Sequence, residues 1–177
     1  MIKTIVITGC SSIGKTTLAK MLLAKYPNIS LVNSFTTREK RAEDINYLYL
    51  TPEEFKQSLT LNEFADWNEV YTNTFYGTKW SSLNELASNN KVPLLVTDNS
   101  GATNYFNITD CLVINLIPKD LDLIKERIMA IRSDNVNQRL EGLNHLYSGV
   151  GNQYCFMQID EVIEQIYSDI EKHINEI

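Results

Sequence analysis

A glycine-rich segment near the start of the chain has the residue types and spacing that bind phosphate. Residues 9–16 read Gly-Cys-Ser-Ser-Ile-Gly-Lys-Thr and fit the pattern G-x-x-x-x-G-K-[ST]. Glycines let successive backbone N–H groups turn inward on phosphate oxygens, Lys15 supplies a charge for the terminal phosphates, and Thr16 supplies a hydroxyl for Mg²⁺. The segment predicts a nucleotide-binding loop, and a chance match in a turn rich in Gly and Ser is the alternative.

The sequence on either side of this loop predicts the elements that such a site requires. The apolar run 5–7 precedes it and is typical of a buried parallel strand, and the residues after it have helical spacing. The positive N-terminal end of that helix would face the same anion. We expect ATP to bind here, with Lys15 in a catalytic role. The expected ATP contacts are Gly9, Ser11, Ser12, Ile13, Gly14, Lys15, Thr16 and Thr17.

A second segment has the residues to bind another anion. Residues 34–41 read Ser-Phe-Thr-Thr-Arg-Glu-Lys-Arg and place Arg38 and Arg41 three positions apart, beside several hydroxyls. Because Arg binds phosphate in a bidentate manner, this pair predicts a second phosphate site and therefore an acceptor that carries its own phosphate. Taken alone, the segment fits a solvated charged loop equally well.

The alternation of apolar and amphipathic segments predicts an α/β fold. A chain of 177 residues fits one domain with a small inserted lid. Core strands are expected at 4–8, 29–32, 94–97 and 111–117. Helices are expected at 79–89, 120–131, 135–147 and 160–177, the last of them packing on the sheet. Such alternation is typical of a parallel sheet flanked by helices on both faces.

The pattern changes between residues 46 and 78, where a small β-rich insertion is expected. Aromatic residues and Thr recur there at strand-like spacing, and Asn73-Thr74 supply a turn. Thr51, Pro52 and Glu54 have the types and spacing of a helix start, since Thr51 can cap and Glu54 completes a capping box. A short helix should therefore interrupt the insertion.

Composition limits the partners that we expect. Sixteen Lys and Arg against 22 Asp and Glu give a net charge of −6, the wrong sign for coating long nucleic acid. No apolar run is long enough to span a bilayer, so we expect a cytoplasmic protein without membrane contact. Three cysteines without metal-ligand spacing indicate neither a disulfide framework nor a zinc site. Loop N–H dipoles could lower the thiol pKa of Cys10, although a filler role is the simpler interpretation.

The chain resembles the guanylate kinase family over nearly its whole length. The matching segments are GCSSIGKTT at 9–17, NSFTTREKR at 33–41, PEEF at 52–55 and NEFADWNEVYTNTFYGT at 62–78. The resemblance implies the fold of the P-loop kinases in a single domain, 1–177. Its core would comprise 1–33 and 79–177, with a nucleotide-monophosphate-binding insertion at about 34–78 and a short lid at about 127–139.

The resemblance also implies roles for individual residues. It assigns the acceptor phosphate to Arg38, Arg41, Tyr47 and Tyr76, and the guanine base to Ser34, Asp66 and Thr78. It assigns Asp98 to the substrate ribose or the water shell of Mg²⁺, and the transition state to the lid residues Arg127 and Arg139. Arg132 lies in the same region, and a role in the lid and a surface ion pair are equally good interpretations of it. Asp66 can select guanine, because adenine has an acceptor where guanine has N1–H.

Three departures from the family pattern keep alternatives open. Residues 42–46 shorten the loop after Arg41, Asp66 is shorter than the Glu common in the family, and Val96 replaces an acid. The leading hypothesis is in-line transfer of the ATP γ-phosphate to GMP or dGMP with Mg²⁺, by a monomer or homodimer that binds only small nucleotides. One alternative is a kinase for another nucleoside monophosphate or a ribose phosphate. The other is a peptide-binding module, which the intact Lys15 and Thr16 disfavour.

Overall fold

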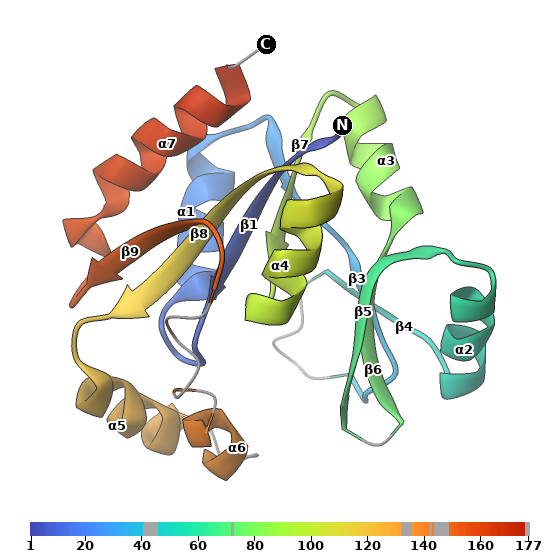
Figure 1. Ribbon diagram of the computed structural model, residues 1–177, viewed down its shortest axis with the longest axis horizontal. Coiled ribbons are helices and arrows are strands. Elements are labelled where there is room, and N and C mark those ends of the chain that lie inside the picture. The colour runs from blue at the N-terminus through green and yellow to red at the C-terminus, as the bar shows by residue number, and fades with distance from the viewer. Residues whose placement is uncertain (41–45, 72, 132–135, 142, 144–148, 176–177) are drawn as a thin grey trace.

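A five-stranded parallel sheet forms the centre of the molecule (Figure 1). The computed structural model describes residues 1–40, 46–71, 73–131, 136–141, 143 and 149–175. In spatial order the strands are β2 (Ile29–Leu31), β7 (Val92–Val96), β1 (Lys3–Gly9), β8 (Asp110–Pro118) and β9 (Asn152–Phe156). Because all pairs are parallel, the carboxyl ends of the strands meet at one edge of the sheet.

Helices cover both faces of this sheet, as the predicted fold class requires. On one face, α1 (Lys15–Lys25) and α7 (Ile163–Asn175) pack against Ile5, Ile7 and their neighbours. On the other face, α3 (Trp80–Ser88) and α4 (Asn99–Ile108) pack against a second cluster around Val6. Consecutive residues of β1 therefore enter opposite cores, which explains why the strand is apolar throughout.

The four predicted core strands are present as β1, β2, β7 and β8, but the sequence pattern missed β9. This edge strand buries only Tyr154 and Phe156, so its sequence lacks a continuous apolar run. The predicted helices appear as α3, α5 (Leu121–Ile131), α6 (Val136–Glu141) and α7, which follows the 3₁₀ turn η2 (Ile159–Glu161). Most of the predicted helical segment beyond α6 lies outside the described residues.

Helix α4 was also missed, because its sequence is rich in Asn, Thr and Gly, which are poor helix formers. Its start is fixed locally, since the Asp98 side chain caps it by accepting a hydrogen bond of 2.9 Å from the Gly101 N–H. Packing then holds it, because Gly101, Ala102 and Tyr105 are buried against the sheet. Tertiary contacts override weak propensity here.

A second, mixed sheet lies beside the first and carries α2 (Pro52–Thr60) (Figure 1). In spatial order its strands are β4 (Tyr47–Tyr49), β3 (Ser34–Thr36), β6 (Thr74–Lys79) and β5 (Phe64–Tyr71). The predicted capping box is present: Glu54 N–H donates to Thr51 Oγ1 at 3.1 Å, and Thr51 N–H donates to Glu54 Oε2 at 2.7 Å. Asn73 forms the predicted turn with a φ of 59°.

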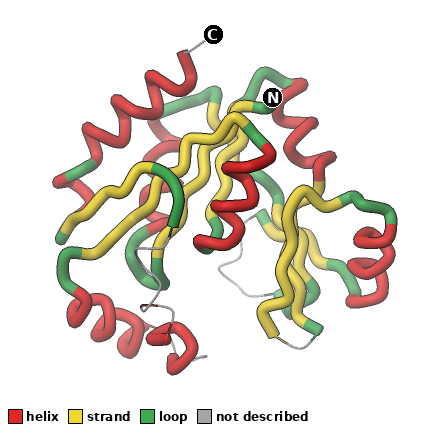
Figure 2. Tube along the Cα trace, in the orientation of Figure 1, coloured by secondary structure: helices red, strands yellow, loops and turns green. Residues whose placement is uncertain are grey.

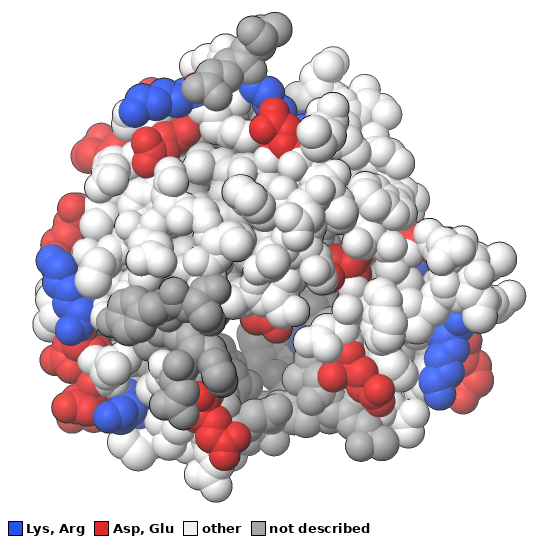
Figure 3. Space-filling view, viewed as in Figure 1, with Lys and Arg blue, Asp and Glu red and all other residues white. Residues whose placement is uncertain are grey.

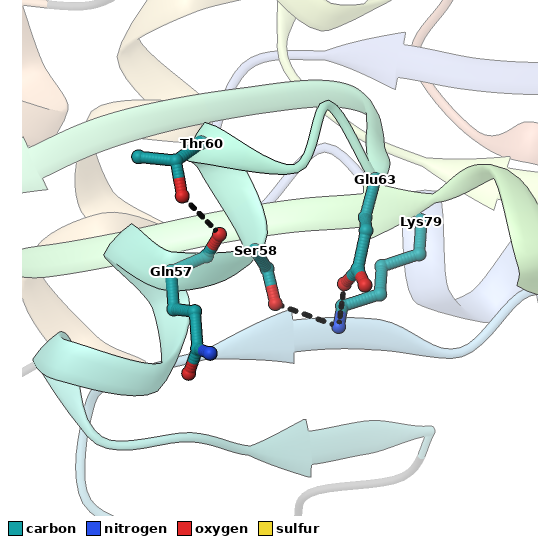
Figure 4. A network of polar contacts seen from close by, with 5 residues as sticks. All are labelled: Gln57, Ser58, Thr60, Glu63 and Lys79. Atoms are coloured by element: carbon teal, nitrogen blue, oxygen red, sulfur yellow. Dashed lines mark hydrogen bonds and ion pairs between the residues drawn. The ribbon is translucent and has the colours of Figure 1, made fainter.

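An aromatic cluster holds α2 on the second sheet. The ring of Phe55 is fully buried, and its centroid lies 4.3 Å from that of Phe64 and 5.2 Å from that of Phe75. Beside it, Lys79 Nζ donates to Ser58 Oγ at 2.9 Å and pairs with Glu63 Oε2 at 2.6 Å (Figure 4). The second sheet thus has a small core of its own.

The two ends of the chain lie at the same end of the molecule (Figure 2). There Lys3 Nζ donates to the His173 carbonyl at 2.7 Å, and a ring nitrogen of His173 lies 3.0 Å from the Thr4 carbonyl oxygen. In the part of the chain that the structure describes, no helix is both long and apolar enough to cross a membrane.

Phe55→Ala should destabilise the protein by about 3–5 kcal/mol, because it removes a large buried ring and leaves a cavity. Phe106→Ala is the matched control, since the Phe106 side chain is 51% exposed. Urea unfolding measures both free energies. Equal losses for the two variants would contradict the small core described for the second sheet.

Candidate active site

The phosphate-binding loop joins the end of β1 to the start of α1 in a tightly constrained backbone. Gly9, Ser12 and Gly14 have φ values of 138°, 61° and 109°. A Cβ at Gly9 would lie 2.6 Å from the Leu116 carbonyl oxygen, so only glycine fits between β1 and β8. A chain of such residues lets backbone N–H groups converge on one anion.

The side chains of the loop are arranged for an anionic ligand. Lys15 Nζ donates to the carbonyls of Gly9 and Cys10, both at 2.8 Å, and therefore lies over the loop backbone. The Ser12 hydroxyl is buried and has no hydrogen-bond partner among the described residues. A phosphate oxygen would satisfy this hydroxyl. Thr16 is exposed in the first turn of α1, beside Lys15.

Cys10 is a core residue, which agrees with the simpler interpretation of the sequence, whereas the alternative of a lowered thiol pKa is wrong. The side chain packs with Ile13 and other apolar residues of the main cluster. Burial raises the pKa of the Cys10 thiol, and the nearby charge of Lys15 lowers it by less. Because desolvation disfavours the thiolate, Cys10 fills space under the loop.

Three of the four residues assigned to the acceptor phosphate lie together. The guanidinium carbon of Arg38 lies 4.9 Å from the ring centroid of Tyr47, and the rings of Tyr47 and Tyr76 meet edge to face at 6.3 Å. The Arg38 N–H donates to Thr36 Oγ1 at 3.3 Å, which holds the backbone at the end of β3. Arg41 lies outside the described residues.

The residues assigned to the guanine base belong to neighbouring strands of the second sheet. Asp66 and Thr78 are directly paired across β5 and β6, so they share one face. Asp66 Oδ1 accepts a hydrogen bond of 2.6 Å from Asn104 Nδ2 on α4. Burial raises the pKa of the Asp66 carboxyl; the Asn104 hydrogen bond lowers it in part, and the charge of Asp98 raises it further.

Ser34 lies at the start of β3, close to the first turns of α1. It is paired in register with Tyr47, and both line a cavity of about 120 Å³. Thr16 and Lys20 of α1 line the same cavity. A single hollow therefore connects the first turn after the phosphate-binding loop with the acceptor segment.

Asp98 follows β7 at the edge of the sheet where the loop leaves β1. These strands are parallel neighbours, with Ile7 paired to Val96, so Asp98 and the loop emerge at the same end. Its Oδ1 is engaged as the cap of α4, which leaves the other oxygen for a ligand. Nearby, Thr8 Oγ1 donates to Asn99 Oδ1 at 2.9 Å and ties α4 to β1.

Of the arginines in the predicted lid, only Arg127 has a side chain among the described residues. Arg127 on α5 lines a small hollow with Ile13 of the phosphate-binding loop and Pro118 of β8, so it lies next to the donor site. Arg139 belongs to α6, but its side chain is not described, and Arg132 lies outside the described residues. Figure 3 shows the surface hollowed between the α5–α6 part and the second sheet.

Sequence reasoning missed Asn104, the residue that contacts Asp66 from the other sheet. The sequence around Asn104 does not indicate a contact with Asp66, because Asn104 lies in a helix that the pattern did not predict. A polar residue in an Asn-rich segment is typical of a solvated loop. Only the packing of α4 against β5 reveals the contact.

The loop glycines should respond differently to substitution. Gly14→Ala adds backbone strain alone, about 1–2 kcal/mol, since no atom lies within 4 Å of the added Cβ. Gly9→Ala adds the same strain and a clash with Leu116, and should cost more. Thermal unfolding without ligand compares the two variants. A smaller loss of thermal stability in Gly9→Ala than in Gly14→Ala would contradict the close approach of Gly9 to Leu116 described above.

Comparison with known proteins agrees with this arrangement. A family model described as guanylate kinase matches residues 1–177. The guanylate kinase of Mesomycoplasma hyopneumoniae (strain 7448) is 35% identical over 189 residues, covering 99% of this chain and 95% of that protein. The guanylate kinase of Clostridium perfringens (strain SM101 / Type A) is 32% identical over 173 residues, covering 94% and 80% respectively.

The fold is similar to that of a solved structure. The crystal structure of guanylate kinase from Anaplasma phagocytophilum superposes with a TM-score of 0.71 at 21% identity, covering 99% of this chain and 87% of that one. The two-sheet architecture is thus shared with that protein. The family model matches the full length of the chain, and the first of these relatives is 35% identical to it, so the chain belongs to the guanylate kinase family.

Proposed function

We propose that the protein transfers the γ-phosphate of ATP to GMP or dGMP by direct in-line displacement, without a covalent enzyme intermediate. The supporting observation is the cavity shared by Thr16, next to the phosphate-binding loop, and by Ser34 and Tyr47 of the acceptor segment. Phosphoryl transfer requires the two phosphates to meet in one space, because positioning and charge neutralisation supply most of the rate.

On the donor side, the loop binds the phosphates of ATP. Its N–H groups and the N-terminal end of α1 face the anion, and the unpartnered Ser12 hydroxyl adds a donor. Lys15 would exchange its present contacts with the Gly9 and Cys10 carbonyls for the terminal phosphates. Arg127, beside Ile13, adds positive charge at the reacting group.

On the acceptor side, Arg38 holds the phosphate of GMP. Stacking on Tyr47 fixes the plane of its guanidinium, which is the orientation that bidentate binding needs. The contact between the rings of Tyr47 and Tyr76 supports a role for both hydroxyls at that phosphate. Arg41 joins this site if the resemblance holds at its position.

The guanine base is recognised by Asp66, Thr78 and Ser34. A carboxylate accepts from N1–H and the exocyclic amine, while a hydroxyl donates to O6. Adenine would leave the half-buried carboxylate of Asp66 facing an acceptor, at a cost of about 1–3 kcal/mol. Asp98, whose Oδ1 caps α4, would contact the ribose with its other oxygen.

The residues at the donor site fit Mg²⁺ bound mainly by the substrate. In the described residues no group of three or more His, Cys, Asp and Glu side chains could hold a metal ion. Mg²⁺ in phosphate sites commonly takes one protein oxygen with phosphates and waters, and the exposed Thr16 hydroxyl offers that oxygen. When bound, the ion would neutralise charge on the ATP phosphates.

We further propose that the insertion at about 34–78 and the lid at about 127–139 close over the substrates. Closure would exclude water, which otherwise competes as the acceptor of the phosphate. Arg139 on α6 would then join Arg127 at the transferring group. The hollow between α5–α6 and the second sheet gives these parts room to approach each other (Figure 3).

A panel of acceptors tests the proposed function. With ATP and Mg²⁺, a coupled assay should show turnover of GMP and dGMP at least about tenfold faster than of AMP or UMP. Asp66→Asn should remove most of this preference, because the amide replaces one of the two acceptor oxygens with a donor and cannot accept from both N1–H and the exocyclic amine. Turnover of a ribose bisphosphate but not of GMP would support the other kinase hypothesis, and calorimetry without ATP binding would support the binding module.

Arg38→Ala should lower kcat/KM for GMP about one hundredfold, because it removes a charge-assisted bidentate contact to phosphate. Arg38→Lys should recover part of this loss, since it keeps the charge without the planar fork. Lys40→Ala is the matched control, because Lys40 is exposed two residues further along. Steady-state kinetics that place Arg38→Ala level with Lys40→Ala would argue against the acceptor site.

A further inference from the structure

The Asp66 carboxylate is held by a helix of the other sheet. Asp66 lies on β5, and its Oδ1 accepts the 2.6 Å hydrogen bond from Asn104 Nδ2 on α4. A Cβ at Gly101, one turn earlier on the same helix, would lie 3.1 Å from Asp66 Oδ2. Both carboxylate oxygens thus meet one face of α4, where residues three apart are neighbours.

We propose that Asn104 is a positioning residue that orients the Asp66 carboxylate toward the guanine base, an inference that rests on the proposed function. A carboxylate with its carbon fixed by β5 can still rotate about its last bond. The Asn104 amide restricts that rotation beside a weaker hydrogen bond with the Trp67 backbone, and lone pairs remain for N1–H and the exocyclic amine of the base. Asn104 itself does not touch the substrate.

Electrostatics gives Asn104 a second effect on the same carboxylate. Burial and the negative charge of Asp98 raise the pKa of Asp66, and the Asn104 hydrogen bond opposes them by stabilising the charged form. Tyr105 is the other titratable group that faces Asp66 from α4, and burial raises the pKa of its hydroxyl, so it stays neutral. Asn104 therefore helps to keep Asp66 ionised, together with a smaller contribution from a hydrogen bond with the Trp67 backbone.

The sign of the pH effect follows from this balance. Only ionised Asp66 accepts from both donors of guanine, so protonation weakens GMP binding. Removing Asn104 raises the pKa of Asp66 further, which moves the acidic limb of the pH profile of kcat/KM for GMP to higher pH. The defect should be largest in acid and shrink as the pH rises.

The test compares Asn104→Ala with Asn107→Ala, an exposed asparagine one turn later on α4. Asn104→Ala should raise KM for GMP about tenfold, with kcat and KM for ATP close to wild type and the acidic limb shifted upward. Asn104→Gln, which keeps the amide donor, should recover part of the loss. Asn107→Ala should match the wild-type protein in every measurement.

Inosine monophosphate provides a second readout, because its base lacks the exocyclic amine of guanine. The wild-type preference for GMP over this analogue should fall in Asn104→Ala, since a less restrained carboxylate meets both donors less often. Thermal unfolding of each variant checks that the fold is intact. A purely structural role would lower stability and reduce turnover of the two acceptors equally.

The outcomes distinguish a failure of the positioning role of Asn104 from a failure of the proposed function. If the wild-type protein turns over GMP and Asn104→Ala keeps its KM, acceptor preference and pH profile, the positioning role is overturned alone. A loss in kcat that is equal for both acceptors, with reduced stability, also overturns it. If the wild-type protein does not turn over GMP, the proposed function fails, and the positioning role fails with it.

Discussion

The close approach of β1 to β8 is the constraint on which the site depends. Gly9 is paired with Leu116 in the parallel register, and its missing Cβ is what lets the loop leave the strand there. The same parallel pairing brings Asp98 after β7 and α5 after β8 to one edge of the sheet. The phosphate-binding loop, Asp98 and the start of α5 therefore meet at an edge that the sheet determines before any ligand binds.

The charges of the candidate site are distributed as the proposed function requires. Lys15, Arg38 and Arg127 lie where phosphates would bind, in a chain whose net charge is −6. Asp66 and Asp98 lie close enough to interact electrostatically, and the proposed function gives them the base and the ribose, which need hydrogen-bond acceptors. Two carboxylates at close range repel each other, and a neutral amide donor offsets this without adding a cation that would compete for the phosphate.

Much of the fold and part of the site could be predicted from the sequence, because local rules determine them. The phosphate-binding loop depends on glycines at fixed spacing, and the capping box at Thr51 depends on four adjacent positions. Strand β9 could not be predicted, because it lies at the edge of the sheet and has few apolar residues. Helix α4 could not be predicted, because its residues have weak helix propensity and tertiary packing stabilises it. The contact of Asn104 with Asp66 depends on that helix and was hidden for the same reason.

The meeting of the two chain ends has a practical consequence for engineering. Lys3 is the first residue of β1 and contacts His173 near the end of α7. Gly9 is the last residue of the same strand, so this contact lies roughly 20 Å from the phosphate-binding loop. A short peptide could join the start of β1 to the end of α7, and the chain could be opened in a surface turn such as that at Asn62, between α2 and β5. A fluorescent or affinity module fused there would sit on the second sheet and report its movement relative to the core.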